Sequence, residues 1–110
     1  MREMTCPLEV IFHILKGKWI PIILWRARIG NQRIADFKKD VIGCNEKMLI
    51  QHINSLIEYE LLEKTEYDVY PKHTEYNLTE FGWKLIPFLA QGQKLGIEYL
   101  QKSELLTKKE

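Results

Sequence analysis

The chain has 110 residues, a hydrophobic content of 45% and a formal net charge of +1. This length supports one hydrophobic core and is too short for two independent ones. The sequence contains no run of the roughly 18 apolar residues that a membrane span requires, and its N-terminus lacks the apolar core of a signal peptide. We therefore predict a single domain over residues 1–110, in a cytoplasmic protein with no membrane partner.

Cysteine and histidine usage argues against a disulfide framework and a metal site. Cys6 and Cys44 are far apart, and neither has a second Cys or His at zinc-ligand spacing. The histidines, His13, His52 and His73, are equally scattered. We expect no metal and no cofactor. We also expect no enzyme, because the sequence shows no nucleophile with a base at hand and no Gly-rich phosphate loop.

Hydrophobic periodicity predicts three helices in the first part of the chain. The first begins at Pro7, ends by Gly17 and places apolar residues at helical spacing, Leu8, Ile11, Phe12 and Leu15. Residues 19–30 are apolar on nearly every side, so a buried central helix is expected there, with Pro21 tolerated in its first turn. A short third helix within residues 32–43 has Ile34, Phe37 and Val41 on its inward face.

The fourth predicted helix has two contrasting faces. Asn45 is a good N-cap residue, and Gly43 lets the chain turn into the helix. The apolar face consists of Leu49, Ile53, Leu56 and Ile57. The opposite face consists of Lys47, Gln51, Asn54 and Glu58.

A hairpin and a long helix complete the predicted elements. Residues 61–67 and 73–79 are β-prone and flank a turn-rich connection, which predicts two antiparallel strands. Thr79 then caps a helix over about 80–106, in which Pro87 should introduce a kink or split the helix in two. This helix is apolar on more sides than a monomer can cover, so we expect a homodimer through the terminal helices. The predicted interface residues are Leu85, Phe88, Leu89, Leu95, Tyr99 and Leu100.

This order of elements predicts a mainly α fold with a small β-hairpin, a winged helix-turn-helix domain with its core at about 6–79. A helix that packs by one face and presents Lys, Gln and Asn on the other can enter a DNA major groove. Two alternatives stay open: the polar face is simply solvated, or the near-neutral domain binds another protein. The basic hairpin tip, Lys72 with His73, favours DNA because cations there can lie along the phosphate backbone.

Four motifs together resemble the HxlR family of bacterial transcriptional regulators. They are Cys-Pro at 6 and 7, Gly-Lys-Trp at 17 to 19, Lys-Met-Leu at 47 to 49 and Glu-Tyr-x-Leu-Thr-x-x-Gly at 75 to 82. The resemblance covers roughly Cys6 to Leu100. It implies a MarR-like homodimer that binds palindromic double-stranded operator DNA, with the helix after Asn45 as recognition helix and the hairpin as wing. Family habit favours a repressor, and the effector is unknown.

The candidate DNA contacts form two groups. On the recognition helix they are Asn45, Glu46, Lys47, Gln51, His52, Asn54 and Ser55, among which Lys47, Gln51 and Asn54 are the base-reading candidates. On the wing and the preceding helix, the candidate contacts are Lys72, His73, Arg33, Lys38 and Lys39. Because Asp36 and Asp40 are interleaved with the last three, a solvated face explains those almost as well.

Two histidines depart from the family, which commonly has Arg at the positions of His52 and His73. Histidine loses its charge near neutral pH whereas arginine does not, so we expect operator affinity to fall as pH rises from about 6 to about 8. His52 lies off the centre of the polar face, and a partly packed ring is an equal alternative there. The family also commonly has Ser at Asn45 and a second Pro at Lys72.

Cys6 precedes a predicted helix, whose dipole would stabilise a thiolate. Some HxlR relatives sense electrophiles, quinones or oxidants through this cysteine; the alternative for Cys6 is a small side chain that fills a gap. Some relatives also pair it with a cysteine near the C-terminus, but none follows Cys44 here. Cys44 is expected to be structural. The three tryptophans, Trp19, Trp25 and Trp83, are expected in core and dimer packing.

Overall fold

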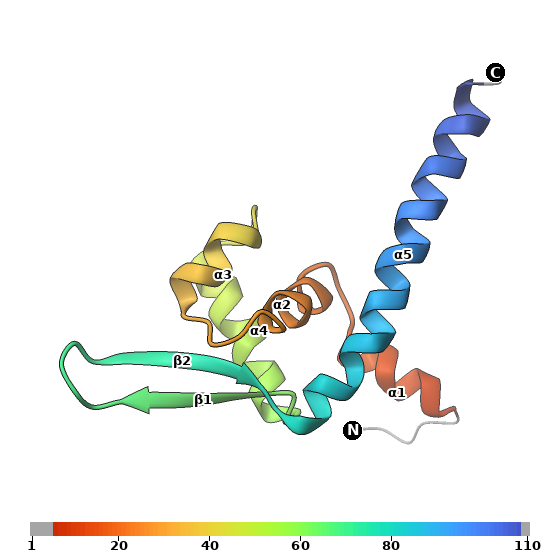
Figure 1. Cartoon of the computed structure of the whole chain (residues 1–110). Helices are drawn as coiled ribbons and strands as arrows, with labels where there is room; N and C mark the ends of the chain where they lie inside the picture. Colours follow the sequence, from red (N-terminus) through yellow and green to blue (C-terminus); the bar gives the residue numbers. More distant parts are fainter. Residues whose placement is uncertain (1–5, 109–110) are drawn as a thin grey trace.

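The computed structural model describes residues 6–108, with side chains described up to residue 104. Within this part the chain forms five helices and one hairpin (Figure 1). In chain order the elements are α1 (Pro7–Ile14), α2 (Trp19–Ala27), α3 (Ile34–Asp40), α4 (Glu46–Glu58), β1 (Leu62–Tyr67), β2 (His73–Leu78) and α5 (Glu80–Lys108). This is the mainly helical fold with a two-stranded antiparallel hairpin that the sequence predicts. The ends of the predicted domain, residues 1–5 and 109–110, lie outside the described residues.

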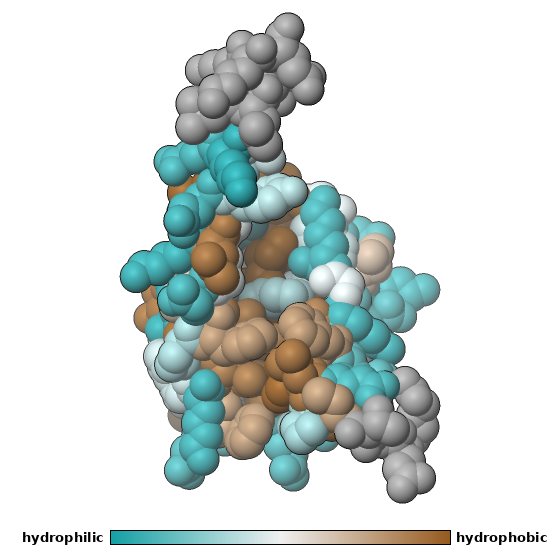
Figure 2. All heavy atoms as spheres, turned by 90° about the vertical axis from the view of Figure 1, so that its right-hand side faces the viewer, coloured by the Kyte–Doolittle hydropathy of each residue, from teal (hydrophilic) through white to brown (hydrophobic). Residues whose placement is uncertain are grey.

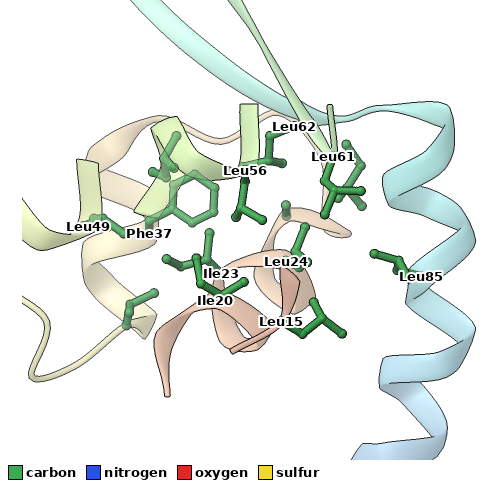
Figure 3. Close-up of a cluster of buried hydrophobic side chains, with 14 residues drawn as sticks. Leu15, Ile20, Ile23, Leu24, Phe37, Leu49, Leu56, Leu61, Leu62 and Leu85 are labelled. Carbon is green, nitrogen blue, oxygen red and sulfur yellow. The ribbon is translucent and has the colours of Figure 1, made fainter. Parts of the chain in front are cut away.

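The core of the domain is organised around α2, which contacts α3, α4, α5 and β2. Its buried residues are Ile20, Ile23, Leu24 and Ala27. Figure 3 shows side chains from α3, α4 and the start of β1 gathered around this helix, among them Phe37, Leu49, Leu56 and Leu62. The helix is not buried all round as predicted, because Ile22 is 38% exposed on its outer side.

The turn between α3 and α4 depends on Gly43. Its φ of 95° lies in the left-handed region, where a side chain is strained. A Cβ at this position would also lie 3.3 Å from the Trp19 ring. The tight turn therefore fixes α4 against α3 and α2, which is the helix-turn-helix arrangement.

The hairpin is attached to the helices along one edge of β2. Its register runs from Leu62 opposite Leu78, both buried, to Tyr67 opposite His73 at the far end. The backbone of Gln32 pairs with Tyr76 of β2, with N···O distances of 3.1 and 2.7 Å. The base of the hairpin is thus held in the core, and the loop at 68–72 projects away from the helices (Figure 1).

The junction between α4, the hairpin and α5 is held by Thr79 and Gly82. The Thr79 hydroxyl accepts a hydrogen bond from the Gly82 N–H at 3.0 Å and donates one to the Glu60 carbonyl at 2.6 Å. The Thr79 N–H donates to the Leu61 carbonyl at 3.1 Å. Thr79 therefore caps α5 as predicted and also fixes it to the end of α4. Gly82 is buried so close to Leu61 that a Cβ would overlap that carbonyl oxygen.

The long helix α5 differs from the prediction in two ways. It is continuous from Glu80 to Lys108, so of the two outcomes predicted for Pro87, a kink or a split, the split is wrong. Pro87 removes one hydrogen bond to the preceding turn, but its ring is exposed, and Leu85 and Leu89 pack against the core on either side of it. Leu85 was predicted at the dimer interface and is instead only 6% exposed, because it packs against the core of its own subunit.

The Gly82→Ala substitution should destabilise the fold by about 2 kcal/mol or more, because the new methyl group forces α5 away from the Leu61 carbonyl. Urea unfolding followed by circular dichroism, at one protein concentration, measures this change. Lys84, the exposed residue that follows Trp83 on the same helix, provides the control position. Lys84→Ala should change the unfolding free energy by less than about 0.5 kcal/mol. Equal stability of the two variants would show that the close approach at Gly82 is not required.

Candidate nucleic-acid interface

The two faces of α4 are separated as the sequence predicts. Leu49, Ile53 and Leu56 are fully buried against the core, whereas Lys47, Gln51 and Asn54 are exposed. The Asn45 side chain accepts a hydrogen bond from the Met48 N–H at 2.8 Å, which confirms Asn45 as the N-cap. The cap uses the amide oxygen of Asn45 and leaves its NH₂ group without a role in the cap. The helix is therefore anchored by one side and open on the other.

The charged residues of α3 pair with different neighbours. Lys38 Nζ lies 3.5 Å from Glu46 Oε1 of α4, and both side chains are more than half exposed. Asp36 accepts a hydrogen bond from the Arg33 N–H at 2.9 Å, and Asp40 lies 2.6 Å from Arg26 of α2. Of the two interleaved carboxylates, Asp36 thus binds the backbone at Arg33, and Asp40 pairs with α2. The Arg33, Lys38 and Lys39 side chains are all exposed, and Lys38 is the one with an ion pair to α4.

His52 and Ser55 are half-buried at the border of the polar face. The Nε2 atom of His52 is inaccessible to solvent and has no hydrogen-bond partner among the described residues. This corresponds to the partly packed ring that the sequence left as an alternative. Of the predicted recognition-helix residues, the structure thus leaves five exposed: Asn45, Glu46, Lys47, Gln51 and Asn54.

The loop of the hairpin presents a mixed surface. Lys72 is 77% exposed, with Nζ 3.5 Å from Asp68. Tyr70 is 97% exposed at the tip, beside Val69 at 70%. Tyr70 was not among the predicted site residues. Its position between Val69 and Pro71 in a predicted loop is the signal that favours an exposed side chain there. His73 is less accessible, since its ring nitrogens face Glu75 and the Pro71 carbonyl.

A second surface lies on the other side of the molecule, where α1 and α2 face α5. It is an apolar groove of about 790 Å³, visible as the brown, hollowed region in Figure 2. Among its lining residues are Phe12, Ile22, Trp25, Phe88, Leu95 and Leu100. Phe12 and Phe88 meet edge to face, with ring centroids 6.2 Å apart. The contribution of α2 to this groove was missed, because its apolar residues were all assigned to the core.

The predicted interface residues beyond Leu85 occupy this surface or its edge. Along α5, Phe88, Leu95, Tyr99 and Leu100 are between 43% and 70% exposed, and Leu89 is half-buried. All residues from 91 to 102 are exposed. The tryptophans also lie partly outside the core. Trp83 is 49% exposed, and the other two are half-buried beneath cations, Trp25 under Arg28 and Trp19 under Lys18.

The two cysteines have different surroundings. Cys6 is exposed at the N-cap position of α1, and its carbonyl accepts a hydrogen bond from the Glu9 N–H at 2.9 Å. Cys44 is half-buried and packs against the core, and this burial raises the pKa of its thiol. A raised pKa leaves less thiolate at neutral pH, which agrees with a structural role for Cys44.

Other classes of site find no support in the part of the chain that the structure describes. Among residues 6–108, no three His, Cys, Asp or Glu side chains group as metal ligands would. None of the helices described has the length and apolar content needed to cross a bilayer.

Comparison with known proteins identifies the family. The sequence profile of the HxlR-like helix-turn-helix domain matches residues 14–104. The chain belongs to the HxlR-like helix-turn-helix family. A relative, the HTH-type transcriptional regulator YkvN of Bacillus subtilis, is 29% identical over 102 residues, which cover 93% of this chain and 86% of YkvN.

Solved structures of regulators have the same fold. The redox regulator HypR in its reduced form superposes with a TM-score of 0.84 at 26% identity, over 90% of this chain and 98% of HypR. A MarR-family transcriptional regulator from Porphyromonas gingivalis W83 gives a TM-score of 0.79 at 31% identity, over 89% of this chain and 96% of that protein. The HxlR chain is therefore a winged-helix transcriptional regulator of MarR-like fold, and not an enzyme, as predicted.

Proposed function

We propose that this regulator binds double-stranded operator DNA as a homodimer, with α4 in the major groove and the β1–β2 hairpin as a wing. The observation that supports the proposal is the division of α4, which buries Leu49, Ile53 and Leu56 and exposes Lys47, Gln51 and Asn54. A major groove about 12 Å wide admits an α-helix whose outward side chains are polar.

The exposed residues fall into roles by their chemistry. Gln51 and Asn54 suit bidentate contacts with adenine, and Lys47 suits guanine or a phosphate. Glu46 is held near Lys38 by their ion pair and can accept from a cytosine amino group. Asn45 and Ser55 lie at the two margins of this face.

Phosphate contacts come from cations around α4. Arg33, Lys38 and Lys39 are exposed on or just before α3, and Lys72 is exposed on the hairpin loop. The net charge of +1 does not oppose DNA binding, because phosphate contacts depend on local cations, and Lys38 lies 3.5 Å from Glu46 of α4. His52 and His73 make weaker candidates for direct contact because their rings are partly enclosed.

Dimerisation through α1, α2 and α5 is supported by how little of α5 is buried within one subunit. The helix extends well beyond the body of the domain (Figure 1), and residues 91–102 are exposed throughout. Helices in proteins are stabilised mainly by packing an apolar face, and Leu95, Tyr99 and Leu100 have no such packing in the described subunit. A second copy related by a twofold axis would cover both grooves and present two α4 helices to a palindromic operator.

We further propose that the regulator is a cytoplasmic repressor that responds to electrophiles through Cys6. Exposure of Cys6 at the start of α1 supports this role. HypR, which shares the fold, is a redox regulator whose structure has been solved in reduced and oxidised forms. Addition of the Cys6 thiolate to a quinone ring carbon forms an S–C bond while the C=C π pair moves onto the carbonyl oxygen, which takes a proton from water. Transfer of the proton from the substituted ring carbon to the second oxygen then gives the hydroquinone thioether. The adduct would add bulk at the start of α1, the helix whose Phe12 lines the apolar groove.

The Gln51→Ala substitution should weaken operator binding by about tenfold to a hundredfold, because a bidentate base contact is worth about 1–3 kcal/mol. The operator is first selected from random duplex DNA, and affinities are then measured by fluorescence anisotropy over a series of salt concentrations. Lys39→Ala should weaken binding to all sequences alike and lower the salt slope by about one. Glu63→Ala on β1 is the control. Absence of DNA binding with a steep salt dependence would favour the alternative of a protein-binding module.

The Leu95→Lys substitution should convert the homodimer into a monomer, because two copies of a charged side chain would be buried at the proposed interface. Analytical ultracentrifugation of the full chain measures the oligomeric state. Lys94→Ala, at an exposed position next to Leu95, should leave the dimer intact. A monomeric unsubstituted protein at micromolar concentration would refute this interface.

The Cys6→Ser substitution should abolish release of DNA by a quinone, whereas Cys44→Ser should retain it, provided that both variants bind operator without the quinone. Electrophoretic mobility shift measures release, and mass spectrometry locates the adduct. Release that persists in Cys6→Ser with the adduct on another residue would rule out the sensor role.

A further inference from the structure

The imidazole ring of His73 has an oxygen acceptor at each of its nitrogens. Nδ1 lies 3.0 Å from the Pro71 carbonyl oxygen, and Nε2 lies 2.8 Å from Oε2 of Glu75. A neutral imidazole carries a hydrogen on only one nitrogen and presents a lone pair at the other. A carbonyl and a carboxylate only accept hydrogen bonds. Both contacts are therefore hydrogen bonds only when the ring is protonated and donates from both nitrogens.

The ring is also enclosed by its neighbours. The side chains of His73 and Glu75 are only 20% and 16% exposed, so salt screens this pair less than an exposed one. The ring stacks on Tyr67, its partner across the hairpin, with centroids 4.6 Å apart and planes 15° apart. A cation over an aromatic face is attracted to it. The stack, the carboxylate and the carbonyl hold the ring from three sides.

Alternation along β2 explains why these groups meet. Residues two apart in a strand point to the same face, which brings Glu75 beside His73. The remaining titratable groups lining the same hollow are Glu66, Asp68 and Lys72. Lys72 lies 3.5 Å from Asp68, so its charge is partly matched there. Carboxylates thus predominate around the ring.

We propose that His73 is a positioning residue that ties the 68–72 loop to β2 when its ring is protonated and releases the loop when the proton leaves. The Pro71 carbonyl belongs to the loop, whereas Glu75 belongs to the strand, so the imidazolium links one to the other. The loop carries Tyr70 and Lys72, the side chains that the hairpin offers to DNA. This inference rests on the proposed function for its effect on DNA. It assigns the pH dependence to the shape of the wing instead of a direct phosphate contact.

The sign of the effect follows from the hydrogen bonds. Deprotonation removes one donor, so one of the two contacts becomes a repulsion between lone pairs. The ordered wing is therefore present at acidic pH and lost as pH rises through the range in which histidine gives up its proton. The substitution His73→Arg supplies a charge that persists throughout this range.

The first test needs no DNA. Imidazole ¹⁵N spectra of the full chain report the protonation of each His73 nitrogen, and backbone ¹⁵N relaxation reports the mobility of the 68–72 loop, from about pH 5.5 to about pH 8.5. We expect both nitrogens to be protonated at the acidic end and the loop amides to become mobile as the ring loses its proton. Loop mobility that does not change when His73 loses its proton would overturn the proposal.

The second test measures operator affinity from about pH 6 to about pH 8. The operator affinity of the unsubstituted protein should fall about tenfold as pH rises over this range, which is the effect of losing one hydrogen bond to a charged group. His73→Arg should hold the acidic affinity across the range. Glu75→Gln should also flatten the profile, because its amide offers Nε2 either an acceptor or a donor and so matches both protonation states of the ring. His13→Gln, on α1, should keep the original profile. If Glu75→Gln retains the full pH profile, His73 acts on DNA directly and the positioning role is wrong. Failure to bind DNA at any pH would refute the proposed function, while the loop measurement still decides the role of His73.

Discussion

The close approach of α5 to the end of α4 is the constraint on which the rest of the structure depends. At Gly82 the helix backbone lies against the Leu61 carbonyl, and Thr79 bonds both to its own helix and to Glu60. Glu60, two residues after the end of α4, adopts the left-handed conformation, with a φ of 61°. Three elements that each need a partner are thereby joined at one point: α4, a hairpin that is unstable alone, and a helix that is mostly exposed.

The helix α2 lies between the core that supports α3 and α4 and the apolar groove along α5. One side carries Ile23 and Leu24 into the core that supports α3 and α4. The other side carries Ile22 and Trp25 into the apolar groove along α5. In the proposed dimer, α2 is the element through which a modification near α1 would act on the two α4 helices.

Local signals predicted the elements well, and long-range contacts account for the misses. Asn45 and Thr79 cap helices because their side chains bond backbone groups within the next three residues, which the sequence shows directly. Pro87 does not split α5, because packing on both sides of it compensates for one lost hydrogen bond. Leu85 repeats with the apolar stripe of α5 but is covered by its own subunit, and periodicity alone cannot distinguish the two kinds of burial.

The candidate site was predictable as a face but not as a set of available side chains. Helical spacing placed Lys47, Gln51 and Asn54 together on the exposed side of α4. It could not show that Lys38 pairs with Glu46 across two helices. Nor could it show that His73 turns toward Glu75, since that contact depends on the orientation of side chains within the hairpin.

The pairing of Gln32 with Tyr76 also determines which edge of the sheet is left open. Gln32 occupies the outer edge of β2, so among the described residues the open edge of the sheet is that of β1. Unpaired strand edges template aggregation, and charged side chains discourage it. Along β1, Glu63, Lys64 and Glu66 are all exposed. These charged side chains therefore disfavour pairing of the open β1 edge with a strand of another molecule.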